Sequence, residues 1–422
     1  MCSSDLRGSA RSVLRAVTPG YSAAVLSVAD ATRTVLERVP RLGSESIPLD
    51  KARGRILATE IISERALPGF DNSAMDGYAV RSAELPATLP VGGVVAAGAP
   101  HTAAIPERTA MRIFTGAPMP ADLDTVVIQE DVTLEGDQVT LPASAPGENV
   151  RRLGEDIAIG EVVLTPGTRI TAWHLGVLAA LGVTTVTVSR APRVALIATG
   201  DELVEVGTAP GPGQLVDSSA HALVALVEEA GGIAHRVGIA RDDVIALADL
   251  IAAALGYDAV ITTGGVSVGD RDHVRAALAA VGVELELYKV AMKPGKPFSF
   301  GLRQDERKTP VFGLPGNPVS TVVAFELFIR PALLAMQGAT TVERPRAPVQ
   351  LVRGYRKQAG RAHYIRAHVV RNGDHLIAHP HPKQGSAMLS SLVPCNALVE
   401  LPADATELLP GTSAPALLLE AV

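Results

Sequence analysis

Apolar residues in the middle of the chain alternate between short continuous runs and helical spacings, which is the pattern of an α/β domain. Runs at 193–198, 233–239 and 258–263 are too short for helices and predict buried strands. After residue 243 the apolar residues recur at i, i+3, i+4 and i+7, which predicts an amphipathic helix with one apolar face: Leu247, Leu250, Ile251 and Ala254. Because strands and helices alternate, we expect residues 191–338 to form a doubly wound α/β domain.

The segments on either side of this domain have different patterns. Helices are predicted at 21–39 and 173–181, with short strands between them at 112–118, 125–128 and 138–141. We therefore expect a β-rich insert domain at 66–153, and an extended composite N-terminal domain, used for dimerisation, from 23–65 and 154–190. Residues 1–22 are expected to be a disordered tail.

The end of the chain predicts a further β domain. A proline-rich linker at 343–348 separates it from the α/β domain, and Asn372-Gly373 lies between two apolar segments. An Asn-Gly pair in that position favours a hairpin with a type I′ turn. We expect residues 339–422 to form a C-terminal β-barrel-like domain, so that the whole chain is a multidomain α/β plus β protein.

Composition narrows the class of protein and its partners. The net charge of −6 and an aromatic content of 3% argue against a nucleic-acid or anionic-membrane partner. Two cysteines, Cys2 and Cys395, cannot form a disulfide framework or a cysteine metal cage, and suit the cytosol. No run approaches the roughly 18 consecutive apolar residues of a membrane span, and residues 1–22 lack the apolar centre of a signal peptide. The sequence therefore predicts a cytoplasmic protein.

Candidate chemistry gathers between residues 258 and 320. Gly264-Gly265 ends a predicted strand, where bare backbone can approach an anion, and Asn317-Pro318 predicts the N-cap and first turn of a helix. Three lysines lie between them: Lys289, Lys293 and Lys296. Lys293 and Lys296 belong to a loop that is restricted by two prolines. One such turn or loop is most often only structural. Together, at successive strand ends, they favour a phosphate ligand held with a divalent ion.

Five acids lie in turns or at the ends of elements: Asp76, Asp156, Glu202, Asp242 and Asp272. Asp242 or its neighbour Asp243 could instead cap a helix, and Glu202 could be a solvated loop residue. The sequence contains no zinc-type histidine spacing, nucleophile elbow or Walker loop. Carboxylates and lysines in this arrangement favour magnesium-assisted phosphate chemistry, in which the ion is held by one or two carboxylates and by the ligand's phosphates.

Seven motifs, in order along the chain, carry a resemblance to a known family. They are FDNSAMDGYAV from residue 70, TGAPMP from 115, RRLGEDI from 151, TGDEL from 199, TGGVSVGD from 263, KPGKP from 293 and GLPGNPVS from 313. Together they resemble the molybdopterin molybdenumtransferases, which include bacterial MoeA and the C-terminal domain of gephyrin. The resemblance runs from about residue 23 to the C-terminus.

The resemblance implies a reaction that spacing alone does not. Members of this family take adenylylated molybdopterin and molybdate, insert molybdenum at the dithiolene with Mg²⁺, and release AMP. They form homodimers, with a cleft between the α/β domain of one subunit and the β-rich domain of the other. The family's catalytic acids fall on the five acids above, with Glu202, Asp242 and Asp272 as magnesium ligands. Its substrate-binding positions fall on Thr115, Gly264, Gly265, Ser267, Lys289, Lys293, Lys296 and Asn317, and more weakly on Arg366 and Ser386.

Two departures and two alternatives accompany this interpretation. Leu153 stands where a third arginine is common in the family, and Ser219 stands where an asparagine is usual. A non-catalytic scaffold is one alternative, because gephyrin's related domain binds receptor tails; the retained acids and lysines argue against it. The other alternative is the preceding step, molybdopterin adenylyltransferase, whose fold resembles the α/β domain. That enzyme and the molybdoenzymes or their chaperones are the expected partners.

Overall fold

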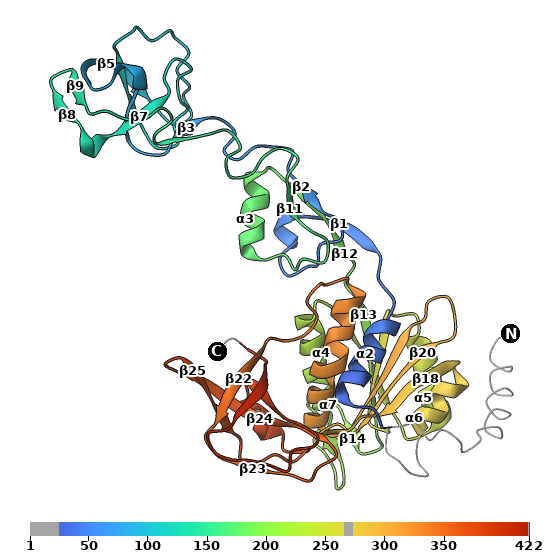
Figure 1. Ribbon diagram of the computed structural model, residues 1–422. Helices are drawn as coiled ribbons and strands as arrows, with labels where there is room; N and C mark the ends of the chain where they lie inside the picture. Colours follow the sequence, from blue (N-terminus) through green and yellow to red (C-terminus); the bar gives the residue numbers. More distant parts are fainter. Residues whose placement is uncertain (1–24, 266–272, 421) are drawn as a thin grey trace, which may run out of the picture. The chain divides into compact units, whose positions relative to one another are not determined.

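The computed structural model describes residues 25–265, 273–420 and 422 (Figure 1). These divide into two compact units. Of the described residues, one unit contains 25–45, 54–58 and those after 187, and the other contains 46–53 and 59–187. The first holds the α/β domain and the C-terminal β domain, and the second holds the β-rich domain.

The α/β domain is built on a six-stranded sheet with strand order β16-β13-β17-β21-β20-β18. The first four strands are parallel, and β20 and β18 are antiparallel to their neighbours. Their apolar runs follow from burial on both faces. The strands are β13 (Arg193–Thr199), β16 (Ile233–Ala240), β17 (Ala259–Thr263), β18 (Val283–Lys289), β20 (Pro297–Arg303) and β21 (Pro310–Leu314).

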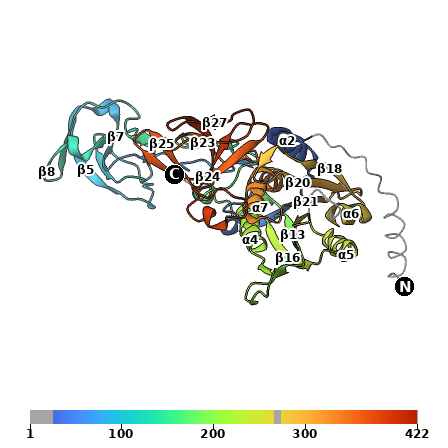
Figure 2. The same ribbon diagram turned by 90° about the horizontal axis from the view of Figure 1, so that it is seen from below.

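Helices cover both faces of this sheet, which confirms the predicted doubly wound domain. Val194 and Leu196 of β13 share one core with helices on one face, whereas Ala195 and Ile197 share a second core with helices on the other. Figure 2 shows the strands between α4 and α7 on one side and α5 and α6 on the other. The helices are α4 (Ser219–Glu229), α5 (Val244–Ala254), α6 (His273–Ala280), α7 (Pro318–Ala324) and α8 (Arg330–Met336).

The helix predicted at 21–39 is α2, observed at Val28–Arg38. Ser27 caps it by accepting a hydrogen bond from the Asp30 N–H (3.1 Å). Its buried residues, Ala31 and Val35, belong to the core of the α/β domain. In the division into compact units, α2 belongs to the first unit and α3 (Ala172–Ala180) to the second. The expected composite domain from 23–65 and 154–190 stays a prediction.

The β-rich domain is a six-stranded sheet with order β7-β4-β6-β5-β9-β8. Tyr78 and Val80 of β4 pack into one core, and Ala79 between them packs into another. This alternation is the period-2 pattern of a strand covered on both faces. The strands are β4 (Gly77–Val80), β5 (Ala87–Val95), β6 (Ala110–Ile113), β7 (Thr125–Ile128), β8 (Thr133–Glu135) and β9 (Gln138–Leu141); β3 (Asn72–Ser73) pairs separately with β10 (Val150–Arg151), and β2 (Ile61–Ile62) with β11 (Val162–Leu164).

The C-terminal domain contains a closed five-stranded barrel, as predicted. Its β24 pairs with both β25 and β26, which closes the order β24-β25-β22-β28-β26. The strands are β22 (Arg346–Leu351), β24 (Ala362–Asn372), β25 (His375–Pro380), β26 (Ala397–Leu401) and β28 (Ser413–Leu418). The short β19 (Met292–Lys293) also pairs with β24; it comes from the loop that carries Lys293 and Lys296, called the lysine loop below.

The hairpin at the end of β24 forms, but the predicted type I′ turn is wrong. Asn372 pairs with His375, so the two central residues are Gly373 and Asp374. Only Gly373 has positive φ, at 58°. A type I′ turn needs positive φ at both central residues, whereas one at the first position alone fits type II′.

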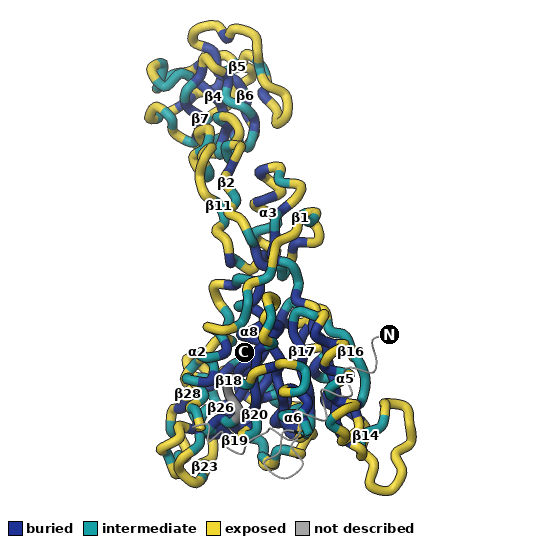
Figure 3. Tube along the Cα trace, turned by 90° about the vertical axis from the view of Figure 1, so that its right-hand side faces the viewer, coloured by how far each residue is buried: buried dark blue, intermediate teal, exposed yellow. Residues whose placement is uncertain are grey.

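The helical stretch from Pro318 to Met336 is 19 residues long and apolar enough to cross a membrane by length and composition. Its most apolar window is 94% buried inside the protein, so it is the central core helix of the α/β domain. Figure 3 shows this segment among the dark, buried parts of the trace, whereas the loop around β14 (Leu203–Val204) and β15 (Leu215–Val216) is exposed.

Candidate functional site

Four parallel strands of the α/β sheet end at the same edge. β13 and β16 remain paired through Thr199 and Ala240, and β17 and β21 through Thr263 and Leu314. β13 and β17 are also neighbours. In open α/β sheets, ligands bind at this carboxyl edge of the strands. The loops that meet there are 200–202, 241–243, 264–265 and 315–317.

The glycine pair after β17 has no room for side chains. Gly264 and Gly265 have φ values of 89° and 65°, which other residues adopt at a cost. A Cβ on Gly264 would lie 2.4 Å from the Thr199 carbonyl oxygen, and one on Gly265 would lie 2.7 Å from Cγ2 of Val274. The turn therefore presents bare backbone at the strand end, as the sequence predicted.

Asp242 and Asp243 have different tasks in the structure. Asp243 is the N-cap of α5, and its Oδ1 accepts a hydrogen bond from the Ala246 N–H (2.8 Å). Asp242 is exposed, and its own N–H donates to Oδ1 of Asp201 (3.3 Å). Because Asp243 fills the capping role, the carboxylate of Asp242 is available for a ligand. Asp201, which sequence reasoning did not select, orients the Asp242 loop.

Glu202 lies on the neighbouring loop, after β13. A Cβ on Gly200 would lie 2.6 Å from Oε2 of Glu202, so the carboxylate folds back over the strand end. The Gly200 N–H donates to the Ala240 carbonyl (3.1 Å), which ties this loop to the end of β16, two residues before Asp242. Glu202 and Asp242 thus follow the ends of two neighbouring strands, which this hydrogen bond joins.

This donor set fits magnesium only together with a ligand. Among the described residues, no group of three or more histidines, cysteines and acids is close enough to hold a metal ion. Mg²⁺ is commonly held by one or two carboxylates, with phosphates and water completing its six ligands. Two exposed carboxylates at the carboxyl edge of the sheet suit that mode. The remaining predicted ligand, Asp272, and the predicted substrate contact Ser267 lie outside the described residues.

The predicted lysine loop passes the start of helix α7. The Val290 N–H donates to the Lys296 carbonyl (3.1 Å), which closes the loop. A Cβ on Gly295 would lie 3.7 Å from the Ser320 carbonyl oxygen, so the loop is next to the first turn of α7. The lysine side chains of this region are exposed or partly exposed: Lys289, Lys293 and Lys296.

The start of α7 also meets the C-terminal domain. Asn317 is the N-cap and Pro318 the first helical residue, as predicted, although the Asn317 side chain makes no capping hydrogen bond. The Val319 N–H donates to the Ser386 carbonyl (3.3 Å). The loop that carries Ser386 therefore lies at the helix N-terminus, and the assignment of Ser386 to an anion site stays a prediction.

The side chain of Arg366 holds that loop in place. Its side chain is among the largest fully buried ones, at 1% exposure. Nε donates to Oγ of Ser391 (3.0 Å), and Nη2 donates to the carbonyls of Lys383 (3.2 Å) and Gly385 (3.0 Å). Two of its three nitrogens are thus used by the protein, which supports a positioning role. Direct contact between Arg366 and an oxyanion stays a prediction.

In the β-rich unit, the structure brings Asp76 and Thr115 together. The N–H and the hydroxyl of Thr115 both donate to Oδ1 of Asp76, at 2.7 and 2.8 Å. These hydrogen bonds, with a smaller contribution from the charge of Arg112, lower the pKa of Asp76 below its ordinary value. The carboxylate is therefore ionised and fixed in orientation. The Arg112 guanidinium lies over the rings of Tyr78 and Phe114, at 5.2 and 5.0 Å.

Asp156 is exposed in a turn of the same unit, where its N–H donates to the Leu67 carbonyl (3.0 Å). Sequence reasoning missed the neighbouring Asp71, which accepts hydrogen bonds from the Leu153 N–H and from Nη1 of Arg152, both at 2.7 Å. These contacts lower the pKa of Asp71. They join the motif at 70–80 to the one at 151–157, and Leu153 contributes through its backbone despite the family's usual arginine.

Comparisons with known proteins agree with this architecture. Three family profiles match in order: the MoeA N-terminal region, domains I and II, over residues 26–182; a probable molybdopterin binding domain over 195–335; and the MoeA C-terminal region, domain IV, over 348–419. The matched ranges cover the β-rich unit, the α/β domain and the barrel.

Individual relatives match along most of the chain. A molybdopterin molybdenumtransferase of Haemophilus influenzae is 40% identical over 327 residues, covering 76% of this chain and 80% of the relative. Molybdopterin molybdenumtransferase 2 of Mycobacterium tuberculosis is 36% identical over 400 residues, covering 92% and 98%. The crystal structure of the molybdopterin biosynthesis MoeA protein from Pyrococcus horikoshii matches with a TM-score of 0.83 and 32% identity, covering 94% of this chain and 100% of that one. The chain therefore belongs to the MoeA family of molybdopterin molybdenumtransferases, enzymes of molybdenum cofactor biosynthesis.

Proposed function

We propose that the protein inserts molybdenum from molybdate into adenylylated molybdopterin and releases AMP, with magnesium as the required ion. The observation that supports this most is the carboxyl edge of the α/β sheet. Two carboxylates, Glu202 and Asp242, lie there on loops that are joined by a backbone hydrogen bond. They are next to the turn at Gly264, which has no side chain. A phosphoanhydride bound with a divalent ion needs both features.

The lysine loop supplies positive charge for two anions. Molybdate and a phosphoanhydride repel each other, and this repulsion must be offset before they can react. Lys293 and Lys296 are exposed beside the first turn of α7, where the positive end of the helix dipole favours anions. In this proposal Lys293 and Lys296 hold molybdate, while the turn at Gly264 and the helix start receive the phosphate groups.

The acids orient the ion and the substrate. Glu202, Asp242 and Asp272 would hold magnesium through their carboxylate oxygens. When bound, magnesium polarises the phosphoanhydride and neutralises charge on the departing AMP. Asp76, ionised and oriented by Thr115, would accept a hydrogen bond from the substrate, and we assign Asp156 a similar task.

The active form in this proposal is a homodimer. Trp173 and Val177 are four residues apart on α3, so they share one helix face, and they are 83% and 37% exposed. Ile159, in the same unit, is 70% exposed. An exposed apolar surface of this kind marks an interaction site, and a second copy of the chain is the partner that the family implies.

We also propose that the protein works in the cytoplasm. It would receive its substrate from a molybdopterin adenylyltransferase and pass its product to molybdoenzymes or their chaperones. The family membership supports this place in the pathway.

The experiment that tests the function is AMP release by the purified protein. Adenylylated molybdopterin is supplied with magnesium and molybdate, and parallel reactions omit molybdate, replace molybdate with sulfate, or remove magnesium with a chelator. The proposal predicts AMP release that requires both magnesium and molybdate. Substrate binding without molybdate-dependent AMP release would contradict it and favour a scaffold.

A further inference from the structure

An aromatic ring is exposed at the end of the β-rich sheet, opposite the carboxylate of Asp76. Phe114 directly follows β6, and its side chain is 40% exposed. In the antiparallel ladder between β4 and β6, Tyr78 pairs with Arg112. Asp76 and Phe114 lie two residues further along the two strands, toward the same end of the ladder. Opposed residues share one face of a sheet, and so do residues two apart, so all four side chains lie on one face.

The contacts at this end of the sheet agree with that placement. The Arg112 guanidinium lies over the rings of Tyr78 and Phe114, at 5.2 and 5.0 Å from their centroids. Nη2 of Arg112 also donates to Oε1 of Gln129, which directly follows β7. The Gln129 N–H donates to the Asp76 carbonyl (3.0 Å). Because β4 lies between β7 and β6, Asp76 lies between Gln129 and Phe114 in a row across three strand ends.

Two groups in this row are open to a ligand. Both hydrogen bonds from Thr115 go to Oδ1 of Asp76, and within the described part of the chain no group donates to Oδ2. Arg112 covers one face of the Phe114 ring, and the remaining exposed surface of the ring meets solvent. A carboxylate oxygen accepts N–H donors, and an aromatic ring favours a second ring stacked on it. A ligand that uses both groups is flat, aromatic and carries an amino group.

Other ligand classes suit this row less well. Phosphate or molybdate would be repelled by the ionised Asp76, whose carboxylate is the acceptor of both Thr115 donors. The charge of Arg112 is already directed at Gln129 and at two aromatic rings. A second cation on the Phe114 ring would lie close to that guanidinium and be repelled by it. A neutral ring with an N–H donor meets neither penalty.

We propose that Phe114 and Asp76 form a subsite for the amino-substituted, fused pyrimidine ring of the substrate. The ring stacks on the exposed surface of Phe114, and its exocyclic amino group donates to Oδ2 of Asp76. Pterin and adenine share this chemistry, and adenylylated molybdopterin contains both. The inference deepens the proposed function and rests on it for the identity of the substrate. Phe114 acts here in binding alone.

The first measurement is the binding of 6-hydroxymethylpterin and of AMP to the full-length protein, without magnesium or molybdate. Pterin fluorescence, which stacking on an aromatic ring quenches, reports the first ligand, and calorimetry reports the second. Phe114→Leu should weaken binding of the recognised ring about tenfold, because a stacking partner is lost. Phe114→Tyr should bind as tightly as the wild type, because it keeps the ring. Binding of both ligands that Phe114→Leu leaves unchanged would overturn the subsite, as would a wild type that binds neither.

Phe70→Leu is the matched control. Phe70 is 48% exposed in the same unit, but it precedes β3, which pairs with β10 outside the six-stranded sheet. We expect this variant to bind both ligands as the wild type does. An equal loss in Phe70→Leu and Phe114→Leu would mean general apolar attraction and would contradict the proposal. Weaker binding of the pterin alone assigns the subsite to the pterin, and weaker binding of AMP alone assigns it to adenine.

The second measurement separates binding from chemistry. With adenylylated molybdopterin as substrate, Phe114→Leu should raise KM about tenfold with kcat nearly unchanged, and Phe114→Tyr should restore KM. A lower kcat with unchanged KM would refute a binding role. A wild type without AMP release would refute the proposed function, whereas the binding titrations would still decide the subsite. AMP release by the wild type with an unaltered KM in Phe114→Leu would remove the subsite and leave the function standing.

Discussion

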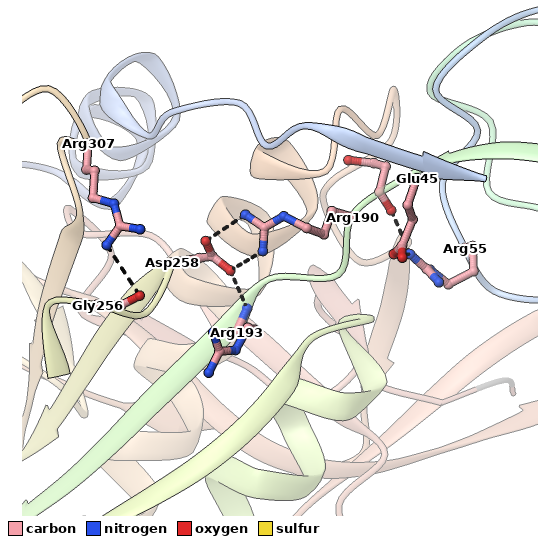
Figure 4. Close-up of polar contacts among 8 residues, drawn as sticks. Glu45, Arg55, Arg190, Arg193, Gly256, Asp258 and Arg307 are labelled. Atoms are coloured by element: carbon pink, nitrogen blue, oxygen red, sulfur yellow. Dashed lines mark hydrogen bonds and ion pairs between the residues drawn. The ribbon is translucent and has the colours of Figure 1, made fainter. Parts of the chain in front are cut away.

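Replacing Asp258 with Asn should destabilise the α/β domain, because Asp258 holds together the starts of two neighbouring inner strands, β13 and β17. Nη1 and Nη2 of Arg190 donate to the two carboxylate oxygens, each at 2.7 Å, and the Arg193 N–H donates to Oδ2 at 2.8 Å (Figure 4). Asp258 and Arg193 directly precede the paired residues Ala259 and Val194 of β17 and β13. These are the strands whose far ends carry Gly264 and Glu202.

The size of the effect follows from burial. The side chains of Asp258 and Arg190 are 17% and 40% exposed, so the pair lies between two limits. Exposed ion pairs contribute about 0–1 kcal/mol, whereas breaking a buried pair costs about 3–5 kcal/mol. Asn keeps one acceptor oxygen but loses the charge and the two-oxygen contact. We therefore expect Asp258→Asn to lower the free energy of unfolding by about 2 kcal/mol.

Urea unfolding of both proteins measures this difference, and its pH dependence tests the cause. Burial raises the pKa of Asp258, but the hydrogen bonds from Arg190 and Arg193 outweigh it, so the net pKa is lower than the ordinary 3.8. The stabilisation is then full above pH 3.8 and is lost as the pH falls through the lowered value. The wild-type advantage should be constant from pH 8 to pH 5 and shrink below about pH 4.

The matched control is Glu205→Gln, which breaks a more exposed ion pair. Glu205 is 52% exposed and bonds Nη2 of Arg236 at 2.5 Å. Its loss should cost less than about 1 kcal/mol. If Asp258→Asn costs no more than this control, the contacts in Figure 4 do not hold the strand starts together and the reasoning is refuted.

Three further predictions test other parts of the account. Gly264→Ala should abolish substrate binding or prevent folding, because its Cβ would lie 2.4 Å from the Thr199 carbonyl oxygen. Gly256→Ala, whose Cβ would meet open space, should change neither substrate binding nor folding. Lys296→Ala should weaken molybdate binding about 10- to 100-fold in calorimetry with an unchanged melting temperature, since it loses a charge-assisted contact; unaltered affinity would assign the loop to structure. The wild type should sediment as a dimer at micromolar concentration and Trp173→Asp as a monomer, and a monomeric wild type would contradict the proposed assembly.

Local periodicity was enough to predict the elements of the α/β domain. Its central strands are covered on both faces, so they appear as continuous apolar runs, and Leu247, Ile251 and Ala254 of α5 are buried as their spacing indicated. The glycine pair at 264–265 was also readable, since its backbone conformation and close neighbours both require glycine.

Features that depend on contacts distant in sequence could not be predicted. The sequence offers Asp242 and Asp243 as equal candidates for the N-cap, and only the backbone at the helix start selects Asp243. Asp71 gained its role from Arg152, which is 81 residues away in the chain. Likewise, the burial of Arg366 depends on a loop that folds back from residues 383–391.

The central claim is that Asp242 serves the reaction and not the helix, and turnover of two neighbouring variants tests it most directly. Asparagine caps helices about as well as aspartate, so Asp243→Asn should keep near-normal melting and AMP release. Asp242→Asn should keep the fold and bind adenylylated molybdopterin, but its magnesium- and molybdate-dependent AMP release should fall by about 10²-fold or more, because a charged oxygen ligand is lost. Near-normal AMP release by Asp242→Asn, or an equal fall in both variants, would contradict the assignment of the active site to this edge of the sheet.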